Sequence, residues 1–191
     1  MRKSREETAA TRRKIVVTAS KEFRKKGIAE TGLKELMLAS GQQTPGGFYK
    51  HFGSKEQLVT EAMNYGFERM LGEMEASIEG AHPKEAFETL ICNYLSPKHR
   101  DRLGEACPLS ALGSELRRLD DETGVVAADG MKKFIALLAE QMKGASSEQA
   151  RKKATAVLSA MVGAVVLSRL AKSAAMSNSI LKDTREFILQ S

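Results

Sequence analysis

The fold is decided by the stretch GLKELMLASGQQTPGGFYKHFGSKEQL, which covers residues 32–58 of this 191-residue chain. It contains two short segments with apolar residues at helical spacing, separated by Gly-Gln-Gln at positions 41–43. Thr31 and Thr44 stand before these segments, and we expect each to cap a helix N-terminus. Two short helices joined by a tight turn predict a helix-turn-helix, in which the first helix holds the second in the major groove of DNA.

The second of these helices is expected to have one apolar side and one polar side. Phe48 and Phe52 would face inward as its anchor, and its two glycines would let the backbone approach a duplex closely. Each glycine also lowers helix stability by about 1 kcal/mol relative to alanine. The residues that would face the groove are Thr44, Gly46, Gly47, Tyr49 and Lys50.

Helical spacing continues on both sides of this stretch, and no segment shows the alternation of a half-buried strand. Gly, Pro and Ser interrupt it at short intervals, and Ser54 and Gln57 have the spacing of a capping box. The sequence therefore predicts an all-α fold of about nine helices, with a helix-turn-helix part at 1–55 and a second helical part at 56–191. The expected helices are 8–26, 33–40, 44–50, 55–71, 83–95, 107–116, 121–143, 147–172 and 178–190, and 96–106 is expected to be a polar loop.

The excess of basic charge is confined to the first third of the chain. Residues 1–60 contain 13 lysines and arginines against 6 acidic residues, whereas residues 61–191 contain 17 against 18. Such an asymmetry indicates a polyanion-binding part attached to a neutral body. On charge alone, the alternative is a basic surface that is merely solvated.

Composition bounds the class and the compartment of the protein. Apolar residues make up 42% and charged residues 28%, which is typical of a globular chain and not of a disordered one. Two cysteines exclude a disulfide scaffold and a cysteine-rich zinc site. The longest apolar run, 154–167, is shorter than the roughly 20 residues of a spanning helix, and the N-terminus lacks the apolar stretch of a secretory signal. We expect a cytoplasmic protein with no membrane partner.

The sequence contains no recognisable catalytic or metal-binding motif. Its three histidines, His51, His82 and His99, do not have the spacing of a metal-binding pair. There is no glycine-rich phosphate loop after a strand and no nucleophile elbow of the form G-x-S-x-G. We therefore expect no enzyme, no metal and no cofactor. A helical adaptor that keeps the helix-turn-helix shape without binding DNA is the alternative.

The runs GIAETGLKEL at 27–36 and TPGGFYKHFGSKEQL at 44–58 resemble the DNA-binding domain of the TetR family of bacterial transcriptional regulators. The resemblance covers about residues 11–62, and beyond it only helix number and length are similar. It implies a DNA-binding domain at 1–55 and an effector-binding and dimerisation domain at 56–191. It also implies a homodimeric regulator, by default a repressor, that binds double-stranded operator DNA and is released by a small molecule of unknown identity.

The resemblance assigns DNA contacts to matching positions. Tyr49 and His51 would contact phosphate oxygens, and Lys55 and Thr31 would do so at the starts of two helices, where the dipole favours anions. The candidates for reaching base edges are Thr44, Lys50, Gln42 and Gln43. The backbone would come closest to the duplex at Gly46 and Gly47. Alternatively, Tyr49 is a packed surface aromatic, His51 caps a helix end and Lys55 is solvated.

The last two expected helices carry apolar stripes that would form the four-helix interface of a dimer, as the resemblance implies. The stripe residues are Val157, Ala160, Met161, Ala164, Val165, Ile180, Thr184 and Phe187. Alternatively, both stripes face the core of their own chain.

The middle helices would enclose an effector pocket with an apolar lining that includes adaptable methionines. The candidate residues are Met70, Met74, Phe87, Ile91, Leu95, Cys107, Leu109, Leu112, Phe134 and Leu138. The alternative is that most of them are plain core.

Cys107 stands before Pro108 at an expected helix N-terminus, where the helix dipole lowers a thiol pKa. A repressor that senses oxidants or electrophiles through this thiol is one hypothesis. A small buried apolar residue is the alternative, and Cys92 is expected to be packed.

Overall fold

The structure is a computed structural model, and it describes residues 5–42, 45–119 and 121–190. Within these ranges all regular elements are helical, which confirms the predicted all-α class with nine α-helices. The elements are α1 (Arg5–Lys26), α2 (Leu33–Ala39), the 3-10 helix η1 (Pro45–Lys50), α3 (Lys55–Ser77), α4 (Pro83–Tyr94), α5 (Pro97–Asp101), the 3-10 helix η2 (Leu103–Glu105), α6 (Pro108–Leu116), α7 (Asp121–Glu140), α8 (Ser147–Leu170) and α9 (Ala174–Gln190).

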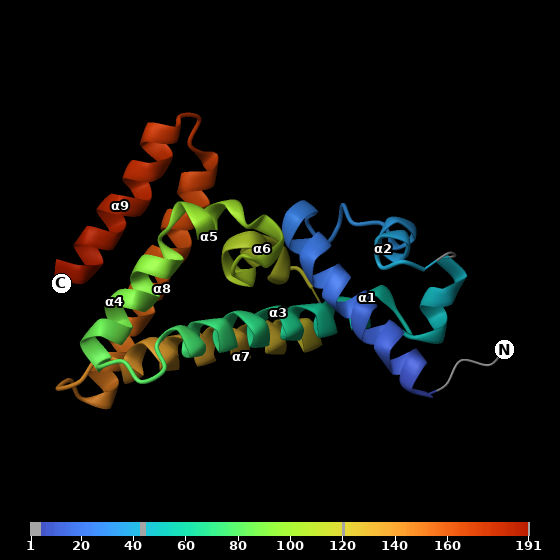
Figure 1. Ribbon diagram of the computed structural model, residues 1–191, viewed down its shortest axis with the longest axis horizontal. Coiled ribbons are helices and arrows are strands. Elements are labelled where there is room, and N and C mark those ends of the chain that lie inside the picture. Colours follow the sequence, from blue (N-terminus) through green and yellow to red (C-terminus); the bar gives the residue numbers. More distant parts are fainter. Residues whose placement is uncertain (1–4, 43–44, 120, 191) are drawn as a thin grey trace.

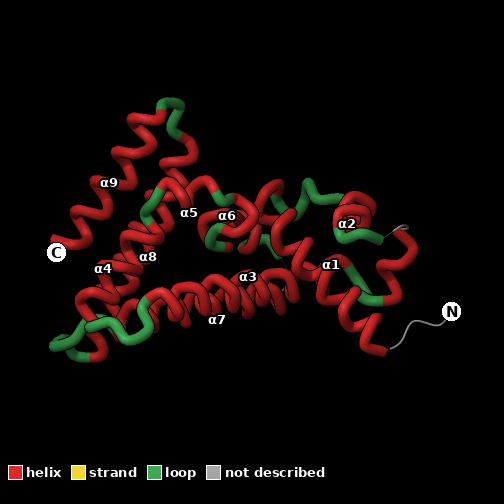
Figure 2. The backbone as a smooth tube through the Cα atoms, in the orientation of Figure 1, coloured by secondary structure: helices red, strands yellow, loops and turns green. Residues whose placement is uncertain are grey.

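The molecule is elongated, with the helix-turn-helix at one end and α9 at the other (Figure 1). α1, α2 and η1 lie together, and α3 leaves them to run beside α7 along the long axis. α4 and α8 cross the far end of this pair, and α9 folds back along α8. Figure 2 shows that the connections between helices are short turns, so neighbouring elements are held closely.

Buried apolar side chains of the described residues form two cores that share α3. The first core joins α1, α2 and η1 to the N-terminal half of α3, through residues such as Leu58 and Met63. The second begins at Phe67 on the same helix and extends through α4, α7, α8 and α9. Leu112 and Leu116 of α6 also belong to the first core. A displacement of α3 or α6 would therefore change the packing of both cores.

Local signals placed most helix ends correctly. Gly27 and Gly41 follow α1 and α2 with φ of 93° and 80°, a left-handed conformation that glycine adopts without strain. Ser54 caps α3: its hydroxyl accepts a hydrogen bond from the Gln57 amide at 3.2 Å, and the Gln57 side chain accepts one from the Gly53 amide at 2.8 Å. This arrangement differs from the predicted capping box in one hydrogen bond: the Gln57 side chain accepts from the backbone amide of Gly53 and not from that of Ser54.

Several element boundaries differ from the prediction. The N-cap of α2 is Gly32 and not Thr31. The segment Pro45–Lys50 is a 3-10 helix. The segment 96–106 contains α5 and η2, because Ser96 caps α5 by accepting a hydrogen bond from the His99 amide at 3.1 Å. α1 begins at 5, α3 extends to 77 and α9 begins at 174.

From the apolar run at 154–167 we expected no segment long enough to span a membrane, and α8 corrects this expectation. The whole helix Ser147–Leu170, at 24 residues, is long and apolar enough to cross a membrane by length and composition. It packs against α6, α7 and α9, and one of its faces lies in the second core. A core helix of this kind meets the same criteria as a spanning one, so its composition alone is weak evidence for a membrane.

Candidate DNA-binding surface and effector cavity

The exposed polar residues of the helix-turn-helix are supported by buried aromatic side chains, which we call its base. Phe48 and Phe52 are buried and stack on each other with ring centroids 5.4 Å apart, so their predicted inward orientation is confirmed. The ring of Phe48 also contacts that of Tyr49 edge-on, at 5.1 Å. Tyr49 is 72% exposed, and Lys50 beside it is exposed as well. The base therefore holds Tyr49 outward without burying it.

Glycine at position 47 is not required by the packing of the protein. A Cβ atom built on Gly47 would lie 3.6 Å from the Met37 Cε atom, which is an ordinary van der Waals contact. Gly46 also lies within η1, and Gln42 is half-buried directly after α2. The predictions for Gln43 and Thr44 fall outside the described residues.

His51 and Arg12 join the end of η1 to α1. The His51 carbonyl accepts a hydrogen bond from Arg12 Nε at 3.2 Å. The Arg12 guanidinium lies over the Phe52 ring, 4.7 Å from its centroid, and pairs with Glu61 of α3. Arg12 thus links α1 to α3 and to the end of η1.

Two of the predicted phosphate-binding side chains are engaged within the protein. Lys55 Nζ donates a hydrogen bond to the Ile28 carbonyl at 2.9 Å, so this ammonium holds the start of α3 against the loop after α1. Thr31 is only 1% exposed, and its hydroxyl donates to the Gly27 carbonyl at 2.6 Å. The Thr31 side chain is therefore turned into the protein, which corrects its assignment as a phosphate contact. The position before an apolar run suggested a cap, but the side chain instead closes the preceding turn.

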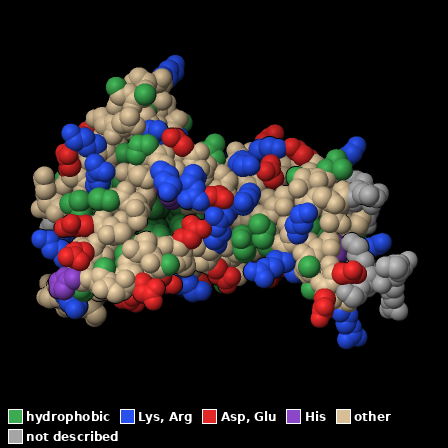
Figure 3. Space-filling model, viewed as in Figure 1, with side chains coloured by type: hydrophobic (Ala, Val, Ile, Leu, Met, Phe, Trp, Pro, Cys, Tyr) green, Lys and Arg blue, Asp and Glu red, His purple; other side chains and the backbone are tan. Residues whose placement is uncertain are grey.

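A cavity of about 250 Å³ lies between α3, α4 and α5. Figure 3 shows Lys and Arg side chains gathered over α5 and α6, beside a hollow with hydrophobic side chains at its base. The residues that line it are Met70, Glu73, Met74, Ser77, Leu90, Asn93, Tyr94, Ser96, Lys98, His99, Arg102 and Glu105.

Most of the predicted effector-pocket residues do not line this cavity. Of its ten candidates only Met70 and Met74 line this cavity. The others are packed: the second core contains Ile91, Leu95, Cys107, Phe134 and Leu138, with Phe87 and Leu109 against it, and the first core contains Leu112. Continuous apolar stripes are buried by helix packing, because removing apolar surface from water is favourable. The cavity lies instead where helix ends and the segment 96–105 bring polar side chains, which the prediction treated as a loop.

The inner wall of the cavity carries buried polar side chains. Tyr94 is 2% exposed, and its ring stacks on that of His99 at a centroid distance of 4.4 Å. Burial, together with the positive charges of Arg169 and Arg102, lowers the pKa of His99 to about 4. His99 is therefore neutral at pH 7. Burial also raises the pKa of the Tyr94 hydroxyl well above its usual value.

Cys107 does not have the properties of a sensor thiol. It is fully buried, and burial raises the pKa of its thiol above the usual value. A reactive cysteine needs an accessible thiolate, so the hypothesis of thiol sensing through Cys107 is disfavoured by its environment. Cys92, which was expected to be packed, is exposed.

The wall of the cavity is bonded directly to α1. Glu105 pairs with Lys21 at 3.2 Å, with Arg69 at 3.4 Å and with Arg102, and the hydrogen bond from Arg102 is the main cause that lowers its pKa to about 2. Arg24 of α1 is buried and donates to the Ala106 carbonyl at 2.9 Å. One short segment, η2 and the residue after it, therefore contacts both the cavity and α1.

α8 and α9 have a buried face and an exposed apolar face. Four of the predicted dimer residues, Val157, Met161, Ala164 and Val165, lie in the core of this chain, which corrects their assignment. Ala160, Ile180 and Thr184 are half-buried, and Phe187 is 71% exposed. The exposed apolar residues of this face, which we call the α8–α9 stripe, are Val166, Leu167, Leu170, Met176 and Phe187. α8 thus has two apolar stripes, of which the predicted one is largely buried in this chain and the other is exposed.

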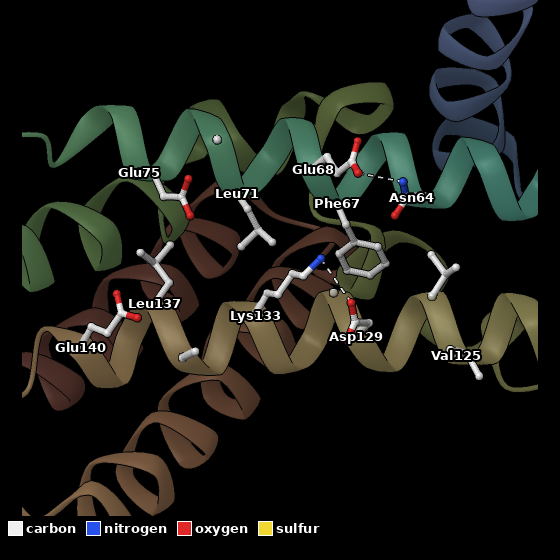
Figure 4. A pocket seen from close by; sticks show the side chains of 14 residues that line it. Asn64, Phe67, Glu68, Leu71, Glu75, Val125, Asp129, Lys133, Leu137 and Glu140 are labelled. Carbon is white, nitrogen blue, oxygen red and sulfur yellow. Dashed lines mark hydrogen bonds and ion pairs between the residues drawn. The ribbon is translucent and has the colours of Figure 1, made fainter.

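A second hollow, of about 470 Å³, lies between α3 and α7 (Figure 4). Two pairs of polar side chains along it each lie within one helix, Lys133 with Asp129 at 3.2 Å and Asn64 with Glu68 at 2.9 Å. At its floor the Phe67 ring rests on Gly130, where a Cβ would come within 2.4 Å of the ring. Gly130 thus allows α3 and α7 to lie close together. The residues that the structure describes include no cluster of His, Cys, Asp or Glu able to hold a metal ion.

Comparison with known proteins agrees with this architecture. Residues 15–62 match the family profile "Bacterial regulatory proteins, tetR family", and residues 83–180 match "Transcriptional regulator LmrA/YxaF-like, C-terminal domain". The chain is similar to the HTH-type transcriptional regulator LmrA of Bacillus subtilis, with 29% identity over 171 residues, covering 85% of this chain and 88% of LmrA.

Solved structures share the fold at low sequence identity. The reduced form of E. coli NemR superposes with a TM-score of 0.79 at 16% identity, over 94% of this chain and 95% of NemR. AibR in complex with isovaleryl coenzyme A and operator DNA gives a TM-score of 0.65 at 18% identity, over 93% of this chain and 97% of AibR. At these identities the likeness shows the fold alone.

Proposed function

Because the chain belongs to the TetR family and is a DNA-binding transcriptional regulator, we propose that it acts as a homodimeric, cytoplasmic repressor released from its operator by a small molecule. The observation that carries this proposal is the exposed Tyr49–Lys50 surface on its Phe48–Phe52 base, at the basic end of the chain. The domain division at residue 55 stays a prediction, since the first core extends into α3 and α6.

DNA would be contacted by η1 and the residues around it. Tyr49 and His51 would bind phosphate, while Lys50 and Gln42 reach base edges together with residues 43–44. The backbone at Gly46 and Gly47 would lie closest to the duplex. The Lys55 ammonium is already hydrogen-bonded to the Ile28 carbonyl. At this position the phosphate contact would therefore be made by the backbone N–H groups at the start of α3.

Dimerisation would occur through the α8–α9 stripe. A monomeric protein rarely exposes a contiguous set of large apolar residues, and such a patch marks an interaction site. A second copy is the occupant that the family implies, and it would place two copies of η1 about 34 Å apart, on successive turns of the major groove. Helix pairs from two chains would then form a four-helix interface.

An effector in the cavity between α3, α4 and α5 would act through the segment that holds α1. Ligand contacts with His99, Arg102 or Glu105 would displace η2, and with it the Ala106 carbonyl that Arg24 binds. The effector can shift DNA affinity only by its differential affinity for the two conformations. AibR, which shares the fold, has been crystallised with both a coenzyme A ester and operator DNA, and this supports a small-molecule response.

Selection of bound genomic fragments, followed by gel-shift titration of the enriched fragment, tests the proposal. We expect one or a few sites with two related half-sites, bound by two chains. The logarithm of the affinity should fall steeply with the logarithm of the salt concentration, because each phosphate contact releases counterions. The absence of any enriched fragment would refute operator binding and favour a helical adaptor, whereas binding that is independent of salt would refute the proposed phosphate contacts.

A further inference from the structure

The carboxylate of Glu115, near the end of α6, is bonded to the backbone of the segment 27–31, which joins α1 to α2. Its Oε2 atom accepts hydrogen bonds from the amides of Ile28 and Ala29, at 2.8 and 3.3 Å. The other oxygen rests against Gly27, where a Cβ atom would come within 2.9 Å of Oε1. A side chain of the body therefore holds backbone groups of the DNA-binding end that lie outside any helix.

The packing of α6 turns Glu115 toward this segment. Positions 112, 115 and 116 share one face of a helix, and Leu112 and Leu116 are both buried in the first core. Glu115 is half-buried between them and forms no ion pair within the described residues, so the two amides are its hydrogen-bond donors. Hydrogen bonds to an ionised acceptor are stronger than those between neutral groups.

The same segment is bonded to the first residue of α3. The Ile28 carbonyl accepts a hydrogen bond from Lys55 Nζ at 2.9 Å, and the Thr31 hydroxyl donates to the Gly27 carbonyl at 2.6 Å. The Ile28 side chain is 6% exposed and packs in the first core. Ile28 thus lies between a carboxylate of α6 and the ammonium at the start of α3.

We propose that Glu115 is a positioning residue for DNA binding, which holds the segment 27–31, and through the Ile28–Lys55 bond the start of α3, in the conformation that binds phosphate. The inference rests on the proposed function, in that the start of α3 contacts the operator. Glu115 would not contact DNA itself, because its charge repels phosphate. It acts by preorganisation: the segment is ordered before DNA arrives, so that binding costs no further conformational entropy there.

Gel-shift titration of full-length variants with the selected operator fragment tests this role. Glu115→Ala removes both hydrogen bonds and should lower operator affinity about ten-fold. Glu115→Gln keeps a carbonyl oxygen as acceptor and should recover most of the loss. Full affinity in Glu115→Ala, or a loss in Glu115→Gln equal to that in Glu115→Ala, overturns the proposal.

The matched control is Glu88→Ala, which removes the same charge from an exposed position on α4. It should bind the operator within about two-fold of the parent, as expected for a surface substitution. An equal loss in Glu88→Ala and Glu115→Ala would show that net charge alone is responsible, and would overturn the proposal.

Coupling to Lys55 separates positioning from a general contribution to stability. Lys55→Met removes the ammonium and keeps a straight side chain of similar helix propensity. The double variant of Glu115→Ala and Lys55→Met should bind the operator about as well as the weaker single variant, because both changes release the same segment. Losses that multiply would show that the two residues act independently, and would overturn the path through Ile28.

Hydrogen exchange of the free proteins gives a readout without DNA. The amides of Ile28 and Ala29 should exchange at least about ten-fold faster in Glu115→Ala than in the parent, because they lose their acceptor. The amide of Leu158, in the second core, should exchange at the same rate in both proteins. Unchanged exchange at Ile28 and Ala29, or equally faster exchange at Leu158, overturns the proposal.

The gel shifts also separate this inference from the proposed function. If the parent binds operator DNA and Glu115→Ala binds it equally well, the positioning role is wrong and the regulator proposal stands. If the parent selects no DNA fragment, the regulator proposal is refuted and the positioning role is refuted with it.

Discussion

At the scale of single residues, burial decides chemistry that residue type alone does not. Cys107 was a candidate sensor because a helix N-terminus lowers a thiol pKa, yet full burial raises that pKa instead. His99 lay in an expected loop, and burial against Tyr94 together with two arginines makes it a neutral hydrogen-bonding group. The environment of each side chain therefore determines its role.

The depressed pKa of His99 predicts a loss of stability in acid. The unfolded chain binds a proton on this residue below its ordinary pKa of 6.5, whereas the folded protein binds it only near 4. The stability contribution of neutral His99 is therefore complete above pH 6.5 and is lost as the pH falls through 4, by about 3 kcal/mol at most. Urea unfolding of His99→Gln from pH 7 to 4 should show a shallower decline than the parent. Identical pH profiles for the two proteins would contradict the burial of a neutral imidazole.

A pair of glycines predicts opposite outcomes of the same substitution. Gly47→Ala should leave the free energy of unfolding within about 0.5 kcal/mol of the parent, because the new Cβ meets only the flexible end of Met37, but it should weaken operator binding. Gly130→Ala should destabilise by about 1–3 kcal/mol, because its Cβ collides with the Phe67 ring. Urea unfolding and gel shifts measure both. Full operator affinity in Gly47→Ala would show that the backbone at 47 does not approach DNA.

At the scale of elements, each apolar helix in this fold has to be assigned a buried face. α8 carries one apolar stripe that enters the core with Val157 and Met161, and another that is exposed with Leu167 and Leu170. A helical period indicates that a stripe exists, but two stripes on one helix leave the choice to the packing of α7 and α9.

The exposed stripe predicts a variant that separates dimerisation from folding. Leu170 is 72% exposed, so Leu170→Glu should leave the monomer fold stable while placing a charge in the proposed interface. We expect light scattering to give the mass of one chain, and operator affinity to fall at least ten-fold. Lys153→Glu, an exposed substitution elsewhere on α8, is the control and should remain dimeric. A dimeric Leu170→Glu protein would place the interface elsewhere.

At the scale of the whole molecule, the two cores are joined through shared helices. α3 contributes to both, and α6 brings Leu112 and Leu116 to the helix-turn-helix while its start lies beside the second core. Glu115 of α6 also accepts hydrogen bonds from the Ile28 and Ala29 amides, at 2.8 and 3.3 Å. These contacts make the DNA-binding end depend on the body of the protein.

This sharing predicts that residues 1–55 do not fold alone. The fragment lacks the α3 residues Leu58 and Met63 and the α6 residues Leu112 and Leu116, so it leaves much of its core exposed to water. Circular dichroism of the isolated 1–55 peptide should show little helix, whereas the intact chain should unfold in a single transition by circular dichroism and tyrosine fluorescence. A folded fragment, or two separate transitions, would show that the two cores are energetically independent.

The sequence by itself determined the all-α class, the helix-turn-helix, the inward rings of Phe48 and Phe52, and the ends of α1 and α2 at Gly27 and Gly41. These features depend on residues a few positions apart, where helical period, capping groups and glycine conformation act locally.

Only the tertiary structure decided which stripe of α8 is buried, that Thr31 turns inward, and that the cavity forms beside Tyr94 and His99. It also decided that Arg24 reaches Ala106, 82 residues away in the sequence. Such contacts depend on which helices meet and at what register, and no local pattern specifies that, because a given apolar face is buried equally well against any partner of suitable shape.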